Sequence, residues 1–111
     1  MHKLDTALVE EAMQRGEFNR LITNSQPTVA IVLSQSWCPE WHNMHAYLSK
    51  MPSDNIYYFL YDESEIFNDF QKFKETTFAN SVIPYVRFYK NGNFVGDSNY
   101  LSVGEFKERL K

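Results

Sequence analysis

Apolar residues near the start of the chain recur with the spacing of two short helices. A first helix is predicted behind Asp5 and Thr6, either of which can cap it, and before Gly16, because four apolar residues stand at helical spacing: Leu4, Leu8, Ala12 and Met13. A second short helix is predicted over about 17–23, and its apolar residues are Phe18, Leu21 and Ile22. The chain is therefore predicted to open with helices rather than with a strand.

The middle of the chain changes to continuous hydrophobic runs. Residues 28–33 have no polar alternation, which is typical of a strand buried on both faces. Cys38-Pro39 opens a helix predicted to reach about residue 51, and its apolar face carries Trp41, Met44, Tyr47, Leu48 and Met51. A second buried strand follows at 56–61. Strand, crossover helix and strand form a βαβ unit, which is right-handed with parallel strands in nearly all proteins.

The last part of the chain combines a helix, a hairpin and a final helix. A third helix is predicted over about 65–74, with the acidic segment 62–65 in its first turn, where carboxylates interact favourably with the helix dipole. Residues 85–95 contain an Asn-Gly pair between β-favouring segments, which predicts a tight antiparallel hairpin. Ser102 and Glu105 have the spacing of a capping box and predict the start of a final helix.

The composition fits one globular domain over 1–111 and excludes two classes of protein. Of the 111 residues, 43% are hydrophobic, which is enough for a single core. The net charge of −3 is scattered and includes no basic block, so nucleic acid is not an expected partner. The longest apolar run, 29–33, is far too short to span a bilayer, and the N-terminus lacks the apolar core of a signal peptide. A single cysteine excludes an internal disulfide, so we expect a cytoplasmic protein without a membrane partner.

Cys38 is the first candidate for chemistry. At the start of a helix, backbone N–H groups and the helix dipole stabilise a thiolate, which predicts a nucleophilic cysteine. The alternative is a small buried apolar residue, as many lone cysteines are. Glu40 lies close to the thiol and opposes the helix terminus, since a neighbouring negative charge raises a thiol pKa. His42, one turn beyond, is off the apolar face and is interpreted as a solvated helix residue.

A metal site is a second possibility at the same helix. Cys38, His42 and His45 are spaced by four and three, and a thiolate with two imidazoles suits zinc or copper. However, the sequence has no evident fourth ligand, and three ligands on one helix seldom converge. We therefore expect neither a metal nor an organic cofactor.

Two motifs together resemble the thioredoxin family over about 17–110. Trp37-Cys38-Pro39-Glu40-Trp41 follows a buried strand, and Val82-Ile83-Pro84 precedes the hairpin. The resemblance implies a thioredoxin-like α/β fold: a mixed sheet of about four strands, helices on both faces, and an N-terminal helix in place of the usual first strand. It also implies a cis peptide bond before Pro84, with Pro84 against Cys38 and the Ile83 backbone presented to an extended substrate segment.

Three positions depart from the family. Trp41 stands where typical members have a second cysteine three residues after the first, so no internal disulfide can close. The family's buried acidic residue falls on Val32, and the lysine often paired with it falls near Tyr58. Dithiol reductase activity is therefore expected to be absent. The joint loss fits a monothiol protein and, equally, a protein without redox function.

Two functions of different class follow. The first is a monothiol thiol–disulfide oxidoreductase, with Cys38 as nucleophile and Trp37, Pro39, Ile83 and Pro84 contacting substrate. Its partners are protein or low-molecular-weight disulfides and thiols. The second is a redox-inactive module that binds a protein partner through the same groove. A sulfenic-acid sensor is a third possibility. Both thiol functions require a sulfur within reach of solvent.

Overall fold

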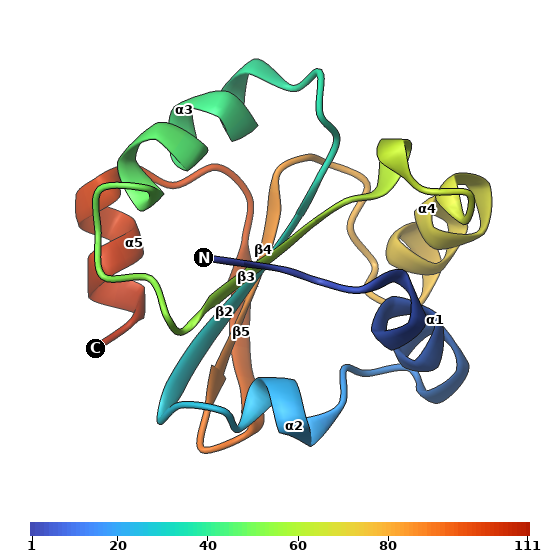
Figure 1. The fold of residues 1–111 in the computed structure, drawn as a ribbon, viewed down its shortest axis with the longest axis horizontal. Coiled ribbons are helices and arrows are strands. Elements are labelled where there is room, and N and C mark those ends of the chain that lie inside the picture. The colour runs from blue at the N-terminus through green and yellow to red at the C-terminus, as the bar shows by residue number, and fades with distance from the viewer.

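The computed structural model describes all residues, 1–111, as alternating helices and strands (Figure 1). The elements, in chain order, are β1 (His2–Lys3), α1 (Thr6–Arg15), α2 (Arg20–Thr23), β2 (Thr28–Ser34), α3 (Pro39–Leu48), β3 (Ile56–Leu60), a 3₁₀ turn (Tyr61–Glu63), α4 (Phe67–Thr76), β4 (Tyr85–Lys90), β5 (Asn93–Ser98) and α5 (Val103–Arg109). None of the helices has the length and hydrophobicity needed to cross a bilayer.

The five strands form one mixed sheet in the order β1-β3-β2-β4-β5. β3 runs parallel to β1 and β2, whereas β4 runs antiparallel to β2 and β5. The prediction of about four strands missed β1, and the N-terminal helix does not replace the first strand but follows it. β1 has only His2 and Lys3, which are polar and exposed, so no hydrophobic pattern marks it. It exists because it pairs with the β3 edge, where the Leu4 N–H also donates to the Tyr58 carbonyl at 2.8 Å.

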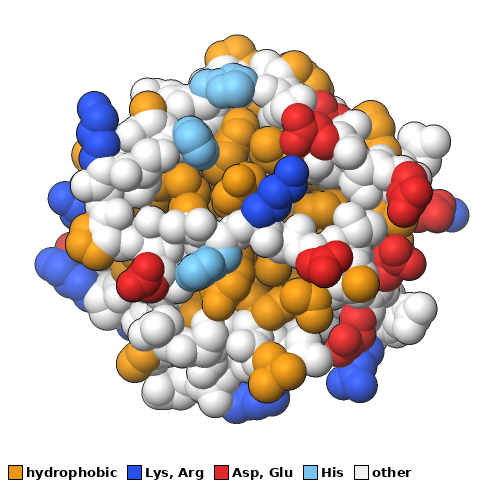
Figure 2. All heavy atoms as spheres, viewed as in Figure 1, with side chains coloured by type: hydrophobic (Ala, Val, Ile, Leu, Met, Phe, Trp, Pro, Cys, Tyr) orange, Lys and Arg blue, Asp and Glu red, His pale blue; other side chains and the backbone are white.

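Helices cover both faces of the sheet, with α3 and α5 on one side and α1 and α4 on the other (Figure 1). Alternate residues of β2 therefore enter two separate hydrophobic clusters: Ile31 faces α1 and α4, and Val32 faces α3 and α5. The prediction that this strand is buried on both faces is confirmed. On the side of the molecule in Figure 2, charged groups of both signs are dispersed among hydrophobic and polar ones.

The helix ends follow local capping, with some shifts from the predicted boundaries. Asp5 caps α1 by accepting from the Ala7 N–H, and Gly16 ends it with a φ of 82°. α2 begins only at Arg20, because Asn19 accepts from the Leu21 N–H and caps the helix there. Of the apolar residues named for this helix, Phe18 and Ile22 are buried, whereas Leu21 is 82% exposed. α3 ends at residue 48 instead of 51, and α4 covers 67–76 instead of 65–74.

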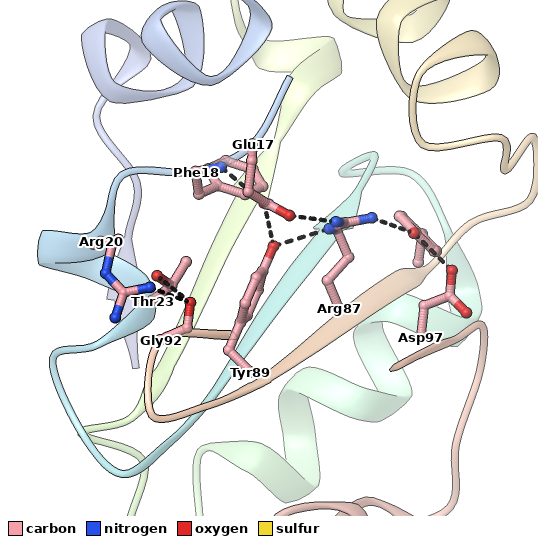
Figure 3. A network of polar contacts seen from close by, with 9 residues as sticks. Glu17, Phe18, Arg20, Thr23, Arg87, Tyr89, Gly92 and Asp97 are labelled. Atoms are coloured by element: carbon pink, nitrogen blue, oxygen red, sulfur yellow. Dashed lines mark hydrogen bonds and ion pairs between the residues drawn. The ribbon is translucent and has the colours of Figure 1, made fainter. Parts of the chain in front are cut away.

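A polar network ties the segment between α1 and α2 to β4 (Figure 3). The buried Arg87 guanidinium donates to Glu17 Oε2 at 2.6 Å and to the hydroxyls of Tyr89 and Tyr85, both at 2.9 Å. The Tyr89 hydroxyl donates to Glu17 Oε1 at 2.5 Å. Burial raises the pKa of Tyr89, so this hydroxyl keeps its proton. The network lies on the α1 and α4 face, away from Cys38.

Candidate functional site

The two motifs of the sequence meet at one end of the central strands of the sheet. Leu33, near the end of β2, pairs with Tyr85, the first residue of β4. Because these strands are antiparallel, the chain leaves β2 and enters β4 at the same end of the strand pair. Cys38 and Ile83-Pro84 are thereby brought to one end of the molecule.

Cys38 is the N-cap residue of α3, as predicted. Its backbone is extended, with φ −72° and ψ 117°, and Pro39 occupies the first helical position. The side chain makes no capping hydrogen bond. The N–H groups of Glu40 and Trp41 in the first turn have no acceptor within the chain. These free donors favour an anion at the helix start, and the Glu40 carboxylate in the same turn opposes it.

The Cys38 side chain is buried, with only 4% of the residue exposed. It packs in the hydrophobic cluster that includes Trp41 and Val86. None of the three surface hollows of the molecule is lined by this residue. The expectation of a thiol within easy reach of solvent is therefore wrong. Helical spacing placed the cysteine at a helix start, but the neighbouring elements that cover it are distant in sequence.

Trp37 and Pro39, on either side of the cysteine, are exposed. Trp37 is 63% exposed and forms an apolar surface beside the thiol position. Its indole Nε1 donates to Gln35 Oε1 at 2.6 Å, and Gln35 Nε2 donates to the Tyr61 hydroxyl at 3.2 Å. The loop before α3 is thus attached to the 3₁₀ turn that follows β3.

Asp62 holds the same loop and was missed from the sequence. Its carboxylate accepts from the Ser36 N–H at 2.7 Å and from the Ser36 hydroxyl at 2.5 Å. The Ser36 carbonyl lies 2.5 Å from His42 Nε2. The sequence predicts that the acidic segment 62–65 forms the first turn of a helix, but Asp62 lies in the 3₁₀ turn. Its partner Ser36 is 26 residues away in the sequence, so no local sequence pattern predicts this contact.

The Ile83–Pro84 peptide bond is cis, and Pro84 is buried. Ile83 is half-buried and packs against both hydrophobic clusters, one of which contains Cys38. The carbonyls of Val82 and Pro84 each accept from Asn99 Nδ2 at 3.0 Å. The N–H and C=O of Ile83 make no hydrogen bond within the chain. Ile83 therefore offers a free donor and a free acceptor, which is what pairing with an extended segment requires.

Apolar side chains occupy the positions that depart from the thioredoxin pattern. Trp41 is buried and packs its ring 5.4 Å from that of Tyr58. Val32 and Tyr58 are register partners between β2 and β3 and both pack in the Cys38 cluster. The space of a second thiol and its charged pair is filled by hydrophobic packing, and Cys38 is the only cysteine.

The three possible metal ligands of α3 do not converge. His42 contacts the Ser36 carbonyl, whereas the His45 ring lies 5.4 Å from Trp41 and 6.5 Å from Tyr58. No group of three or more His, Cys, Asp or Glu side chains is arranged to hold a metal ion.

Comparison with known proteins gives matches in structure only. No protein-family model and no curated protein sequence matches the chain. Mitochondrial thioredoxin 3 of Saccharomyces cerevisiae, in its oxidised form, superposes with a TM-score of 0.64 at 17% identity, covering 99% of this chain and 92% of that chain. Fasciola hepatica thioredoxin gives 0.59 at 15%, covering 99% and 96%. A buckwheat glutaredoxin–glutathione complex gives 0.58 at 13%, covering 96% and 90%.

Identities this low bear on the fold alone. The matched structures span nearly the whole chain, and its mixed sheet with helices on both faces agrees with them. This chain therefore has a thioredoxin-like fold.

Proposed function

We propose that the protein is a monothiol thiol–disulfide oxidoreductase. The Cys38 thiolate attacks one sulfur of a disulfide, the substrate S–S bond breaks, and the other sulfur leaves as a thiolate. The product is a mixed disulfide between Cys38 and the substrate. An external thiolate then attacks the substrate sulfur, which regenerates the Cys38 thiolate and leaves a new disulfide on the substrate. No second cysteine of this chain takes part.

The observation that supports this proposal is the free N–H and C=O of Ile83, which lie at the end of β2 and β4 where α3 begins. An extended segment pairing with this N–H and C=O adds a short bridge to the protein. Exposed Trp37 and Pro39 supply apolar contacts beside it, and buried Pro84 fixes the start of β4. The N–H groups of Glu40 and Trp41 at the start of α3 are unpaired. Cys38 is buried, so its sulfur comes within reach of a disulfide only when the side chains that cover it move, and the proposed reaction requires that movement.

The burial of Cys38 favours a second candidate, a redox-inactive module that binds a protein segment through the same Ile83 main-chain groups. In this case Cys38 is a packing residue, and the Ile83 groups alone capture the segment. The predicted partners differ: disulfides and thiols for the oxidoreductase, a non-covalent protein partner for the module. The predicted cytoplasmic location suits the first function, because its reducing thiols would resolve the mixed disulfide.

Incubation with a disulfide followed by intact-protein mass spectrometry separates the two functions. The first probe is glutathione disulfide, because one of the similar structures is a glutaredoxin–glutathione complex. The folded wild-type protein is expected to gain one glutathione adduct, which reduced glutathione removes, and Cys38→Ser is expected to gain none. The second probe is a disulfide-bonded peptide, which also engages the Ile83 groups.

The same incubation in urea is the control for burial. Unfolded wild-type protein is expected to form the adduct, since its single thiol is then exposed. If only the unfolded protein reacts with either probe, thiol exchange is not the function and the binding module is the better interpretation.

A further inference from the structure

Lys74 is a buried charged residue that the proposed reaction does not use. It lies in the last turn of α4, is 1% exposed and forms no ion pair. Its Nζ donates to the carbonyls of Asn80 at 2.9 Å and Val82 at 3.0 Å, with Asn80 Oδ1 at 3.4 Å. A buried ammonium is costly unless its donors are satisfied. Here the partners are all in the loop that leads to Ile83.

Asn99, between β5 and α5, holds the same loop from another direction. Its Nδ2 lies 3.0 Å from the carbonyls of Val82 and Pro84 and 3.1 Å from Asn80 Oδ1. The Asn80 side chain returns a bond to Asn99 Oδ1 at 3.2 Å and accepts from the Val82 N–H at 3.0 Å. The Val82 and Pro84 carbonyls on either side of Ile83 are thus bonded inside the chain, whereas the N–H and the carbonyl of Ile83 are free.

We propose that Lys74, Asn80 and Asn99 form a carbonyl clamp that positions the Ile83 main chain to pair with an extended segment of a substrate or partner. The three are positioning residues, since none is proposed to touch the reacting sulfur. The inference rests on the proposed function only in taking Ile83 as the docking point, which both candidate functions share. The clamp joins α4, the loop before β4 and the segment before α5, so the docking point is fixed by three parts of the chain.

The geometry also makes the clamp sensitive to pH. Burial lowers the pKa of Lys74 to about 8, against the raising effect of Glu75 on the same helix. The Tyr85 ring of β4 lies 5.4 Å from Nζ, and its hydroxyl bonds to Asp97 and Arg87. Burial raises the pKa of Tyr85 to about 12, so this residue does not titrate in the same range. The neutral amine has one hydrogen fewer for the same acceptors, and the clamp loosens as pH rises through the Lys74 pKa.

The test compares Lys74→Met with Lys72→Met, an exposed lysine on the same helix whose side chain makes no hydrogen bond or ion pair. Two rate constants are measured: mixed-disulfide formation with a disulfide-bonded peptide, and alkylation of Cys38 by iodoacetamide. Lys74→Met is expected to slow the peptide reaction about tenfold or more, because displaced positioning groups are costly even without contact to the reacting atoms. Alkylation is expected to change less than about twofold, and Lys72→Met to change neither. Equal slowing of both reactions, or no slowing, would overturn the clamp.

A second measurement does not depend on thiol exchange. In wild-type protein, the amide resonances of Val82 and Ile83 are expected to titrate together with a midpoint near the Lys74 pKa of about 8, and this titration is expected to vanish in Lys74→Met. Asn99→Ala serves if Lys74→Met does not fold, with the same split expected between the peptide and iodoacetamide reactions. If the wild-type amides titrate in this way but the protein never forms an adduct, the clamp proposal stands and the oxidoreductase proposal is wrong. Amides that do not titrate contradict the clamp itself.

Discussion

The surroundings of Arg87 show how a single charged residue is stabilised while buried on one face of the sheet. Its guanidinium carbon lies 3.8 Å from the ring centroid of Phe78 and 4.0 Å from that of Phe94. The edge of the group is bonded to Glu17 and two tyrosine hydroxyls. Aromatic faces attract a cation, and the planar guanidinium presents its donors outward between them. Glu17 is the only carboxylate in contact with this charge.

Glu17→Gln is therefore expected to destabilise the protein by about 1–3 kcal/mol, since a buried charge loses its ionic partner. Urea unfolding at pH 7 measures the change. The matched control is Glu108→Gln, which breaks an ion pair with Lys111 whose side chains are both largely exposed. Exposed pairs of this kind contribute about 0–1 kcal/mol, so the control is expected to change little. Equal effects of the two substitutions would show that the Arg87 network is not a stabilising unit.

At the scale of one element, α5 depends on a local capping box. Ser102 Oγ accepts from the Glu105 N–H at 3.3 Å, and Glu105 Oε1 accepts from the Ser102 N–H at 2.9 Å. These bonds from Ser102 lower the pKa of Glu105. The helix has only seven residues and buries Phe106 against the Cys38 cluster, so its start must be fixed for that side chain to pack.

Ser102→Ala removes one half of this box and is expected to cost about 0.5–2 kcal/mol of folding free energy. Thermal unfolding followed by circular dichroism reports it. The comparison is Ser81→Ala, an exposed serine whose side chain makes no hydrogen bond, where no measurable change is expected. Because Glu105 has a lowered pKa, the contribution of the box is present above the ordinary carboxyl range and is lost as pH falls through the folded-state value. The variant that tests this pH dependence is Glu105→Ala, which removes the titrating carboxylate, and a cost of this substitution that persists undiminished at strongly acidic pH would contradict this account.

At the scale of the whole molecule, Lys74 and the tyrosines shape alkaline stability in opposite directions. Burial lowers the pKa of Lys74 from 10.5 to about 8, so the unfolded chain binds more protons between these values and stability rises with pH. Burial raises the pKa of Tyr47, Tyr85 and Tyr89 above 10.0, so at higher pH the unfolded chain loses protons first and stability falls.

The free energy of unfolding is thus expected to rise from about pH 8 to pH 10 and to fall above pH 10. Urea titrations at closely spaced pH values test this profile. In Lys74→Met the rise is expected to disappear while the fall above pH 10 stays. A variant that keeps the rise would show that another group causes it.

The sequence alone determined what depends on near neighbours in the chain. Helical spacing and Pro39 placed Cys38 at a helix start, continuous β-branched residues marked β2, and Ser102 with Glu105 marked the start of α5. Each of these features is formed by interactions within one or two helical turns or within one strand, so the residues that cause it are close together in the sequence. The thioredoxin-like fold was implied by the resemblance of the motifs at 37–41 and 82–84 to that family.

Only the tertiary structure decided how the site is covered and held. β1 arises from pairing with β3, Cys38 is buried by side chains of other elements, and Asp62 reaches the loop before α3 across 26 residues. Lys74 and Asn99 belong to different elements and meet only at the loop before Pro84. Such contacts exist because the sheet brings distant segments together, and their polar groups carry no period that a sequence pattern could show.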